Sequence, residues 1–347
     1  MRMPAEWEQH AATWLGWPHN ETDWPGRHAP IPWVYAEFAR KLTPGELVRV
    51  IVPSEKHERE AREIFRRAGV NAKRVEYFRH PTNRGWTRDF GPIWVETHLG
   101  VAIARFRFTG WAKYPDYQKD DAIPPEAGRR LKARVLPAKS AGRDVVLEGG
   151  SIDVNGRGTI LTTEECLLDR KVQVRNQGFT RRDYEAIFAD CLGASNTLWL
   201  GKGIAGDDTH GHVDDLCRFV EARTVVLVRE RNGKDENHRR LEENWDRVAG
   251  FRLEDGARLN VVELPMPAPI VFDGQRLPAS YANFYVGNAA VLVPTFNDPN
   301  DRLALGILQE LFPDRQVVGV HALELVWGLG TIHCLTQQQP AGRLAKP

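Results

Sequence analysis

One cysteine near the C-terminus lies in a segment that could hold a reactive thiol. Residues 326–340 run from a loop with two glycines, Gly328 and Gly330, into a short apolar stretch that carries Cys334. These glycines can adopt φ > 0 and let another group approach the backbone closely. A free cysteine in a terminal strand is equally typical of a buried small hydrophobe. The segment alone therefore leaves two interpretations, a nucleophile and a core thiol.

A histidine further upstream supplies the first group that a cysteine nucleophile needs. His212 lies in the sequence Asp-Asp-Thr-His-Gly-His-Val-Asp-Asp at residues 207–215. The thiolate is the nucleophilic form, and a nearby imidazolium lowers the thiol pKa and can then protonate a leaving group. We therefore expect His212 and Cys334 to form a pair. His333, adjacent to the cysteine, is the weaker partner, because neighbours on a strand point to opposite faces.

Three carboxylates occupy comparable positions in polar, glycine-bearing motifs. Asp89 lies in Trp-Thr-Arg-Asp-Phe-Gly-Pro (86–92), Glu148 precedes Gly-Gly, and Asp214 follows the histidines. Two carboxylates can hold a planar guanidinium through charge-assisted hydrogen bonds, and a third can keep a histidine protonated. This set predicts a cysteine hydrolase of a small cationic guanidine. For Glu148 alone, a loop carboxylate before a turn is an equally good interpretation.

Two rival functions use some of the same residues. His210, His212 and Asp214 have a His-x-His-x-Asp spacing that can bind a metal ion and resembles the start of the metallo-β-lactamase motif. Asp215 takes the place of the histidine that closes that motif. The second rival is a non-catalytic propeller whose acidic pockets bind cationic ligands. A GxGxxG match at 201–206 is followed by acidic residues instead of a helix, which disfavours a nucleotide site.

Composition excludes several classes of function. The formal net charge of +1 over 347 residues gives no footprint for nucleic acid or an anionic membrane. No apolar run approaches the roughly 20 residues of a membrane helix, and the first residues lack the apolar core of a signal peptide. The four cysteines show no CxxC spacing, which disfavours a zinc site or a disulfide framework. We expect a cytoplasmic protein with reduced thiols, and a homo-oligomer is compatible with the sequence.

The elements that must position these residues repeat one arrangement, in which a polar motif leads into a β-rich segment, a turn and a second β-rich segment. The predicted strand pairs are 93–96 with 101–108, 151–154 with 159–162, 217–221 with 225–228, and 284–286 with 290–294. The predicted helices between them are 34–42, 54–68, 181–191, 236–248 and 301–311. With the cysteine segment as the fifth motif, the pattern predicts one domain, residues 1–347, built as a closed α/β propeller of five repeats. An ordinary α/β sheet is the alternative, and we expect a loose tail after Pro340.

The motifs together resemble the signature blocks of the agmatine deiminase and bacterial-type peptidylarginine deiminase family. The resemblance covers residues 3–340 and rests on the segments Met3-Pro-Ala-Glu-Trp-x-x-His10, Trp86-x-Arg-Asp-x-Gly-Pro92, Glu148-Gly-Gly150, Asp207-Asp-Thr-x-Gly-His-Val-Asp214, Ser280-Tyr-x-Asn-Phe-Tyr285 and Ile332-His-Cys334-x-Thr-Gln-Gln. For the fold, it implies the five-bladed pseudo-symmetric α/β propeller of guanidino-group-modifying enzymes, called a pentein, with a central active site.

The resemblance also implies a reaction and a role for each site residue. Cys334 attacks the guanidinium carbon, while Asp89 and Asp214 hold the guanidinium nitrogens. His212 protonates the departing ammonia and then activates water, and Glu148 positions and charges His212. The implied reaction is agmatine and water to N-carbamoylputrescine and ammonia, a step of putrescine biosynthesis, through a covalent S-alkylthiouronium. It implies no metal and no organic cofactor, and a citrulline product from peptidyl arginine is the alternative outcome.

The chain departs from the family pattern at positions that bear on the substrate. Agmatine deiminases usually carry three consecutive glycines before the Ile-His-Cys block, whereas this chain has Leu329 between two glycines. They usually carry Phe-Asn-x-Trp-Gly, and Thr109 and Ala112 replace the Asn and the Gly. Trp86 and Trp111 are candidate substrate-binding walls. Asp208 joins these tryptophans as a candidate for binding the distal ammonium of agmatine. The sequence therefore leaves three kinds of substrate open: agmatine, peptidyl arginine or another guanidine.

Overall fold

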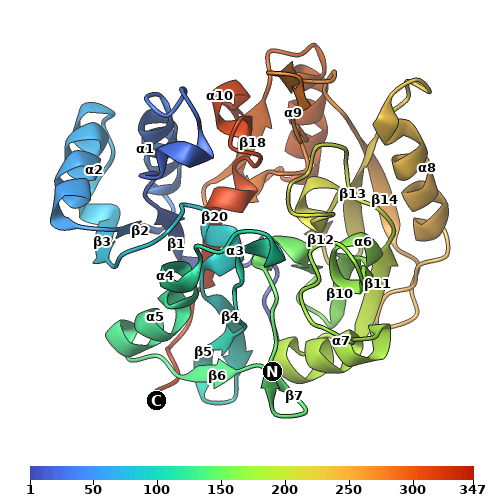
Figure 1. Cartoon of the computed structure of the whole chain (residues 1–347), viewed down its shortest axis with the longest axis horizontal. Coiled ribbons are helices and arrows are strands. Elements are labelled where there is room, and N and C mark those ends of the chain that lie inside the picture. Colours follow the sequence, from blue (N-terminus) through green and yellow to red (C-terminus); the bar gives the residue numbers. More distant parts are fainter.

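Figure 1 shows small β-sheets arranged around a centre, with most of the helices on the outside. The computed structural model describes residues 1–347. Five sheets have three or four strands, in the orders β20-β1-β2-β3, β4-β5-β6, β9-β10-β11, β12-β13-β14 and β17-β18-β19. Their bounds are β1 (His10–Gly16), β2 (Leu47–Val52), β3 (Val75–Arg79), β4 (Ile93–Thr97), β5 (Gly100–Arg105), β6 (Val135–Pro137), β9 (Asp153–Val154), β10 (Thr159–Thr163), β11 (Asn196–Leu200), β12 (Cys217–Glu221), β13 (Thr224–Arg229), β14 (Asn260–Pro265), β17 (Tyr285–Val286), β18 (Ala290–Thr295), β19 (Gln316–His321) and β20 (Thr336–Pro340).

Each sheet combines an antiparallel pair with a parallel pair, which explains why the repeat was visible in the sequence. In β4-β5-β6, Ile93 faces Ala104 in the antiparallel pair and Ile103 faces Val135 in the parallel pair. An antiparallel pair needs only a short turn, whereas a parallel pair needs a crossover connection, usually a helix. The turn and the helix therefore recur once in each repeat. The repeated sheets form the closed α/β propeller that the pattern predicted.

The fifth sheet is assembled from both ends of the chain. β20 pairs antiparallel with β1, with Leu15 opposite Thr336, and β1 pairs parallel with β2. This pairing closes the ring and brings Cys334, which precedes β20, beside the N-terminal segment. The expected loose tail after Pro340 was wrong. Ala345 is fully buried and its backbone N–H donates to the carbonyl of Val101.

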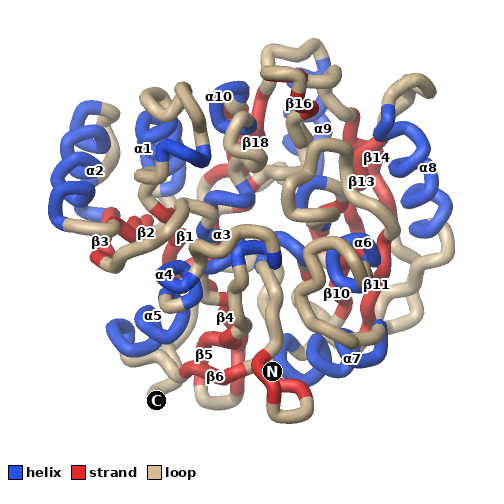
Figure 2. The backbone as a smooth tube through the Cα atoms, in the orientation of Figure 1, coloured by secondary structure: helices blue, strands red, loops and turns tan.

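Most of the helices lie around the outside of the sheets, as the blue segments of Figure 2 show, whereas the short helix Thr87–Phe90 (α3) lies at the centre. They are α1 (Ile31–Leu42), α2 (Glu55–Arg67), α3 (Thr87–Phe90), α4 (Gln118–Asp121), α5 (Ile123–Leu131), α6 (Glu164–Leu168), α7 (Arg181–Ile187), α8 (Glu236–Val248), α9 (Asn300–Leu311) and α10 (Leu323–Val326). The predicted helix 181–191 ends as an α-helix at Ile187 and continues as a π-helical turn to Leu192. None of these helices combines the length and the apolar character needed to cross a membrane.

Short helical turns at the centre carry the polar motifs. These turns are α3 and the 3₁₀ turns Gly149–Ser151, Val213–Asp215 and His333–Leu335. The first of them packs against 149–151 and 333–335, and 149–151 packs against 213–215. The expected strand around Cys334 was therefore wrong, because the chain turns at 333–335 before it enters β20. The motifs of four sheets consequently meet at one place.

Candidate active site

The structure brings together all five ionisable residues that were expected to do chemistry. His212 Nδ1 lies 3.7 Å from Asp89 Oδ1 and 4.0 Å from Asp214 Oδ1, and its Nε2 lies 3.8 Å from Glu148 Oε2. Cys334 Sγ lies 3.8 Å from Asp214 Oδ2. All five side chains are buried. The four motif turns at the centre of the fold therefore form one cluster.

The Glu-Gly-Gly motif leaves room for this cluster. A Cβ atom on Gly150 would lie 2.6 Å from His212 Nδ1 and 2.8 Å from Asp89 Oδ1, which is closer than real side chains approach. The Gly150 backbone N–H also donates to Asp89 Oδ1 at 3.0 Å. Glycine is needed here because the backbone itself passes between the catalytic candidates.

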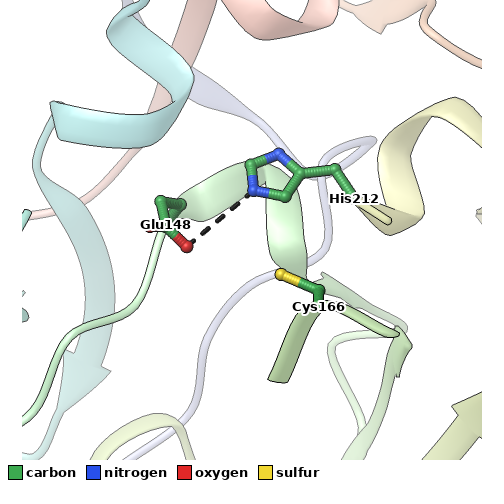
Figure 3. Close-up of side chains that lie close together, drawn as sticks. All are labelled: Glu148, Cys166 and His212. Atoms are coloured by element: carbon green, nitrogen blue, oxygen red, sulfur yellow. Dashed lines mark ion pairs between the residues drawn. The ribbon is translucent and has the colours of Figure 1, made fainter. Parts of the chain in front are cut away.

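His212 has an environment that keeps it charged. Its ring nitrogens make no hydrogen bond within the protein, while Glu148 and Cys166 point toward the ring, as Figure 3 shows. One atom of each of these three residues lies within 4.8 Å of the others. Burial alone would lower the pKa of His212, but Asp89, Cys166 and Glu148 raise it well above its ordinary value. The ring is therefore an imidazolium at neutral pH, available to give up a proton.

Glu148 is held as an anion by an arginine that no motif had indicated. Arg175 Nε lies 3.1 Å from Glu148 Oε1, and both side chains are fully buried. Burial opposes ionisation, but Arg175 and His212 outweigh it and lower the pKa of Glu148 to about 2. Arg175 also donates to the carbonyls of Gln173 and Thr209, which fixes its position. The loop-carboxylate interpretation of Glu148 is thus replaced by a buried ion pair next to His212.

Cys334 is a neutral thiol in the unliganded site. Burial raises its pKa well above the ordinary value, and the charges of Asp214, Asp215 and Asp89 act in the same direction. The thiol can donate a hydrogen bond to Asp214 Oδ2. A cation placed among these carboxylates would offset the repulsion that keeps the sulfur protonated.

His333 uses both ring nitrogens to hold other side chains. Its Nδ1 lies 2.7 Å from Asp214 Oδ2, and its Nε2 lies 2.8 Å from Glu6 Oε2. We expected His333 to be the weaker partner of Cys334 because neighbours on a strand point to opposite faces. That argument was wrong, because residues 333–335 form a 3₁₀ turn. The ring still faces Asp214 and Glu6, so it orients a carboxylate of the site.

The metal site of the rival interpretation, built on His210, His212 and Asp214, is not assembled. His210 Nε2 lies 2.9 Å from Asp169 Oδ2, outside the cluster. The groups of potential ligands that do converge are Glu148 with Cys166 and His212, and Asp214 with Asp215 and Cys334. The metal-hydrolase alternative loses its ligand set, since its first histidine is engaged elsewhere.

A cavity of about 260 Å³ opens onto the thiol. Its lining includes Cys334, Asp89, Trp86 and Trp111, the expected nucleophile, one expected carboxylate and both expected aromatic walls. Trp111 Nε1 donates to Asp89 Oδ2 at 2.9 Å, so the wall also orients the carboxylate. Of the remaining ionisable candidates, His212 lies next to Asp89 and Asp214 lies next to Cys334, while Glu148 contacts His212.

Comparison with known proteins places this geometry in a family. The model of the Porphyromonas-type peptidyl-arginine deiminases matches residues 2–340. The chain belongs to this family. The agmatine deiminase of Stutzerimonas stutzeri is 34% identical over 363 residues, which cover 98% of this chain and 95% of that protein.

Solved structures of similar proteins share the whole fold. The agmatine deiminase of Enterococcus faecalis superposes with a TM-score of 0.89 at 29% identity, covering 98% of this chain and 95% of that one. A cysteine-to-serine variant of the C. jejuni agmatine deiminase with substrate bound gives a TM-score of 0.86 at 29% identity, covering 98% and 96%.

Two departures from the family pattern lie beside the cavity, and both have unusual backbone. Leu329 lines the cavity with φ 70°, and Ala112 follows Trp111 with φ 52°. The glycines on either side of Leu329 do not have positive φ, contrary to expectation. Gly330 is needed for space, because a Cβ there would lie 2.8 Å from the Trp86 ring. The third departure, Thr109, leaves its hydroxyl without a hydrogen-bond partner.

Some residues of this family site were not singled out from the sequence. Asn283 and Glu6 lie within segments that carried the resemblance, so the signal was present but gave no role. Arg175 and Cys166 had no motif around them. Their importance follows only from packing, since a buried carboxylate or imidazolium needs partners that sequence spacing does not identify.

Proposed function

We propose that this family member hydrolyses agmatine to N-carbamoylputrescine and ammonia. The observation that carries this proposal is the cavity that ends on Cys334, with His212 and three carboxylates clustered at its inner end. A buried thiol surrounded by acidic groups suits a cationic electrophile, because the substrate supplies the positive charge that the site lacks. The relatives named as agmatine deiminases support the choice of substrate.

Each residue has a defined part in the proposed mechanism. Asp89 and Asp214 accept hydrogen bonds from the guanidinium, whose positive charge lets the Cys334 thiol release its proton to solvent. The resulting thiolate adds to the guanidinium carbon. The C–N bond to one terminal nitrogen breaks as the His212 imidazolium transfers its proton to that nitrogen, and ammonia leaves. An S-alkylthiouronium remains. Holding both reactants in one geometry can supply roughly 7–11 kcal/mol of the barrier reduction in well-aligned systems.

Hydrolysis of the intermediate reverses the role of the histidine. Neutral His212 takes a proton from water, and the hydroxide adds to the same carbon. The C–S bond then breaks as the hydroxyl proton of the adduct passes to the sulfur, which gives the ureido product, the Cys334 thiol and the His212 imidazolium. The buried anion Glu148 favours the imidazolium in both half-reactions and thereby keeps the proton on His212 until it is needed.

The outer part of the cavity supports a substrate with a second positive charge. Besides Asp89 at the inner end, Asp23 and Asp208 line the cavity, and the single lining arginine, Arg84, is already paired with Asp23. Asp208 is held by Lys113 and by the hydroxyl of Tyr114, which lies 2.8 Å from Oδ2. An α-carboxylate would approach a lining in which acidic groups outnumber the one arginine, so the lining favours agmatine over free arginine.

The test is an ammonia-release assay with agmatine, free arginine and a peptide that contains arginine. We expect agmatine to be the best substrate by kcat/KM, and we expect Cys334→Ala to remove turnover while agmatine still binds. Cys191→Ala, at a half-buried thiol away from the site, is the matched control and should retain activity. Ammonia release by Cys334→Ala would exclude this cysteine as the nucleophile.

We further infer that residues 1–347 act as a single catalytic domain of five repeats, since the site draws on motifs from separate sheets.

A reducing cytoplasm suits a chain whose four cysteines are all free thiols. Sedimentation at several protein concentrations would test the expected homo-oligomer.

A further inference from the structure

Asn283 is a fully buried residue whose side chain contacts the sulfur of Cys334. Its Nδ2 lies 3.1 Å from Cys334 Sγ and 2.9 Å from Asp215 Oδ1. The distance to sulfur is short enough for an N–H···S hydrogen bond. The mechanism above gives this residue no role.

The orientation of the Asn283 amide is fixed by its other contacts. Its Oδ1 accepts from the Thr331 hydroxyl at 2.7 Å, from the His333 backbone N–H at 3.0 Å and from the Cys334 backbone N–H at 3.4 Å. Backbone N–H groups can only donate, so they require an oxygen at this position. The two hydrogens of Nδ2 must therefore face Cys334 and Asp215, and a flipped amide is ruled out.

The groups around the sulfur favour different protonation states. Asp214, Asp215 and Asp89 disfavour the thiolate through their charge, and Asp214 Oδ2 can accept a hydrogen bond from the thiol. An N–H donor has the opposite effect, because a hydrogen bond to the charged form of a group stabilises that form. Asn283 is the side chain that directs such a donor at the sulfur, and the backbone N–H of Thr331 acts in the same direction.

We propose that Asn283 is a catalytic residue that stabilises the Cys334 thiolate and aims it into the cavity. The side-chain amide donates one N–H to the sulfur, and the three donors on its oxygen hold the turn that carries the nucleophile. An uncharged donor suits this position, because a lysine or arginine would pair with the carboxylates that are needed for the substrate. The inference rests on the proposed function of Cys334 as nucleophile.

Asn283→Asp is the most direct test, since it keeps the acceptor oxygen and the shape while replacing the donor by a carboxylate oxygen. The rate of Cys334 alkylation by iodoacetamide, followed by mass spectrometry from pH 7 to 12, reports the thiolate without any substrate. We expect the midpoint of that profile to rise by about one pH unit or more, because a donor to the thiolate is lost and a carboxylate oxygen takes its place. The kcat/KM for agmatine should fall by about 100-fold or more, on the scale seen for loss of one transition-state donor.

Asn244→Asp is the matched control for burial. Asn244 is equally buried, accepts from the Gly201 N–H and donates to the Lys202 carbonyl, far along the chain from the cysteine. Its variant should leave the alkylation midpoint unchanged. Should Asn283→Asp not fold, Thr331→Val removes one anchor of the amide and should shift the midpoint in the same direction by a smaller amount.

The outcomes separate this inference from the function on which it rests. A folded Asn283→Asp protein, or Thr331→Val in its place, with the wild-type alkylation midpoint overturns the role of Asn283. If the variant has a raised midpoint and the wild-type enzyme releases no ammonia from agmatine, the role of Asn283 at the thiol is supported and the proposed substrate is rejected.

Discussion

Asp89 is a cavity carboxylate that loses its charge more easily than an ordinary aspartate. Burial raises its pKa to about 6, and the negative charges of Asp214 and Glu148 act in the same direction against the opposing effect of His212. Its ionised form is the one that can accept two hydrogen bonds from a guanidinium. The substrate binding that we propose for Asp89 is therefore present above about pH 6 and declines as the pH falls through that value.

This titration predicts an acid limb in the pH profile of agmatine turnover. Below about pH 6, kcat/KM should fall close to tenfold per pH unit, and the change should appear mainly in KM, because protonated Asp89 loses an ionic contact. In Asp89→Asn the carboxyl group is absent, so we expect a raised KM and no limb in this range. An unchanged limb in that variant would assign the titration to another group.

The site residues could be predicted from the sequence because each belongs to a motif of several residues. Asp89, Glu148, His212, Asp214 and Cys334 were all expected at the centre, and all are there. Partners such as Arg175 could not be predicted, since long-range contacts leave no local pattern. The contact between Arg175 and Glu148 joins positions 27 residues apart without any periodic signal.

Among the elements, those with a clear period were predictable and the short turns were not. The helix predicted at 236–248 has these bounds in the structure, and so does the strand predicted at 217–221. The turn 333–335 was expected to be a strand, because three residues are too few to show a helical period. The ring closure between β1 and β20 was equally hidden, since the fifth repeat is divided between the two ends of the chain.

The loop before Cys334 is held in a conformation that its central residue disfavours. Leu329 has φ 70°, in the left-handed region that costs an L-residue about 1–2 kcal/mol. Its side chain is half-buried and lines the cavity. Burial of part of a leucine side chain recovers about 1 kcal/mol, so the two effects nearly cancel.

Leu329→Gly should consequently separate stability from substrate binding. We expect the free energy of unfolding to change by less than about 1 kcal/mol, because relief of backbone strain offsets the lost burial. KM for agmatine should rise several-fold, since the cavity loses an apolar wall. Ala141→Gly, at an exposed position with φ 48°, relieves a similar strain outside the site and should leave KM unchanged. Equal KM values for Leu329→Gly and wild type would show that the side chain does not contact the substrate.

At the scale of the whole molecule, one buried carboxylate joins the repeats at the axis. Glu6 Oε1 lies 2.9 Å from Arg218 Nη2, on β12, and Oε2 lies 3.0 Å from Arg88 Nη2, on α3. Glu6 also accepts from the Val286 N–H of β17 and contacts His333, while Arg218 reaches Asp153 on β9. Every one of the five sheets, or the turn leading into it, thus contributes a group to this network.

Glu6→Gln should therefore destabilise the entire fold. The change keeps the shape and the acceptor for Val286, but it leaves Arg88 and Arg218 with less negative charge in a buried site, which typically costs about 3–5 kcal/mol. Urea unfolding would measure the loss, and Glu55→Gln is the matched control. Glu55 pairs with Arg59 at an exposed i,i+4 position, where loss of the pair costs less than about 1 kcal/mol. If both variants lost the same small amount, the axial network would contribute no more than a surface ion pair, and closure of the ring would rest on β20 and the apolar core instead.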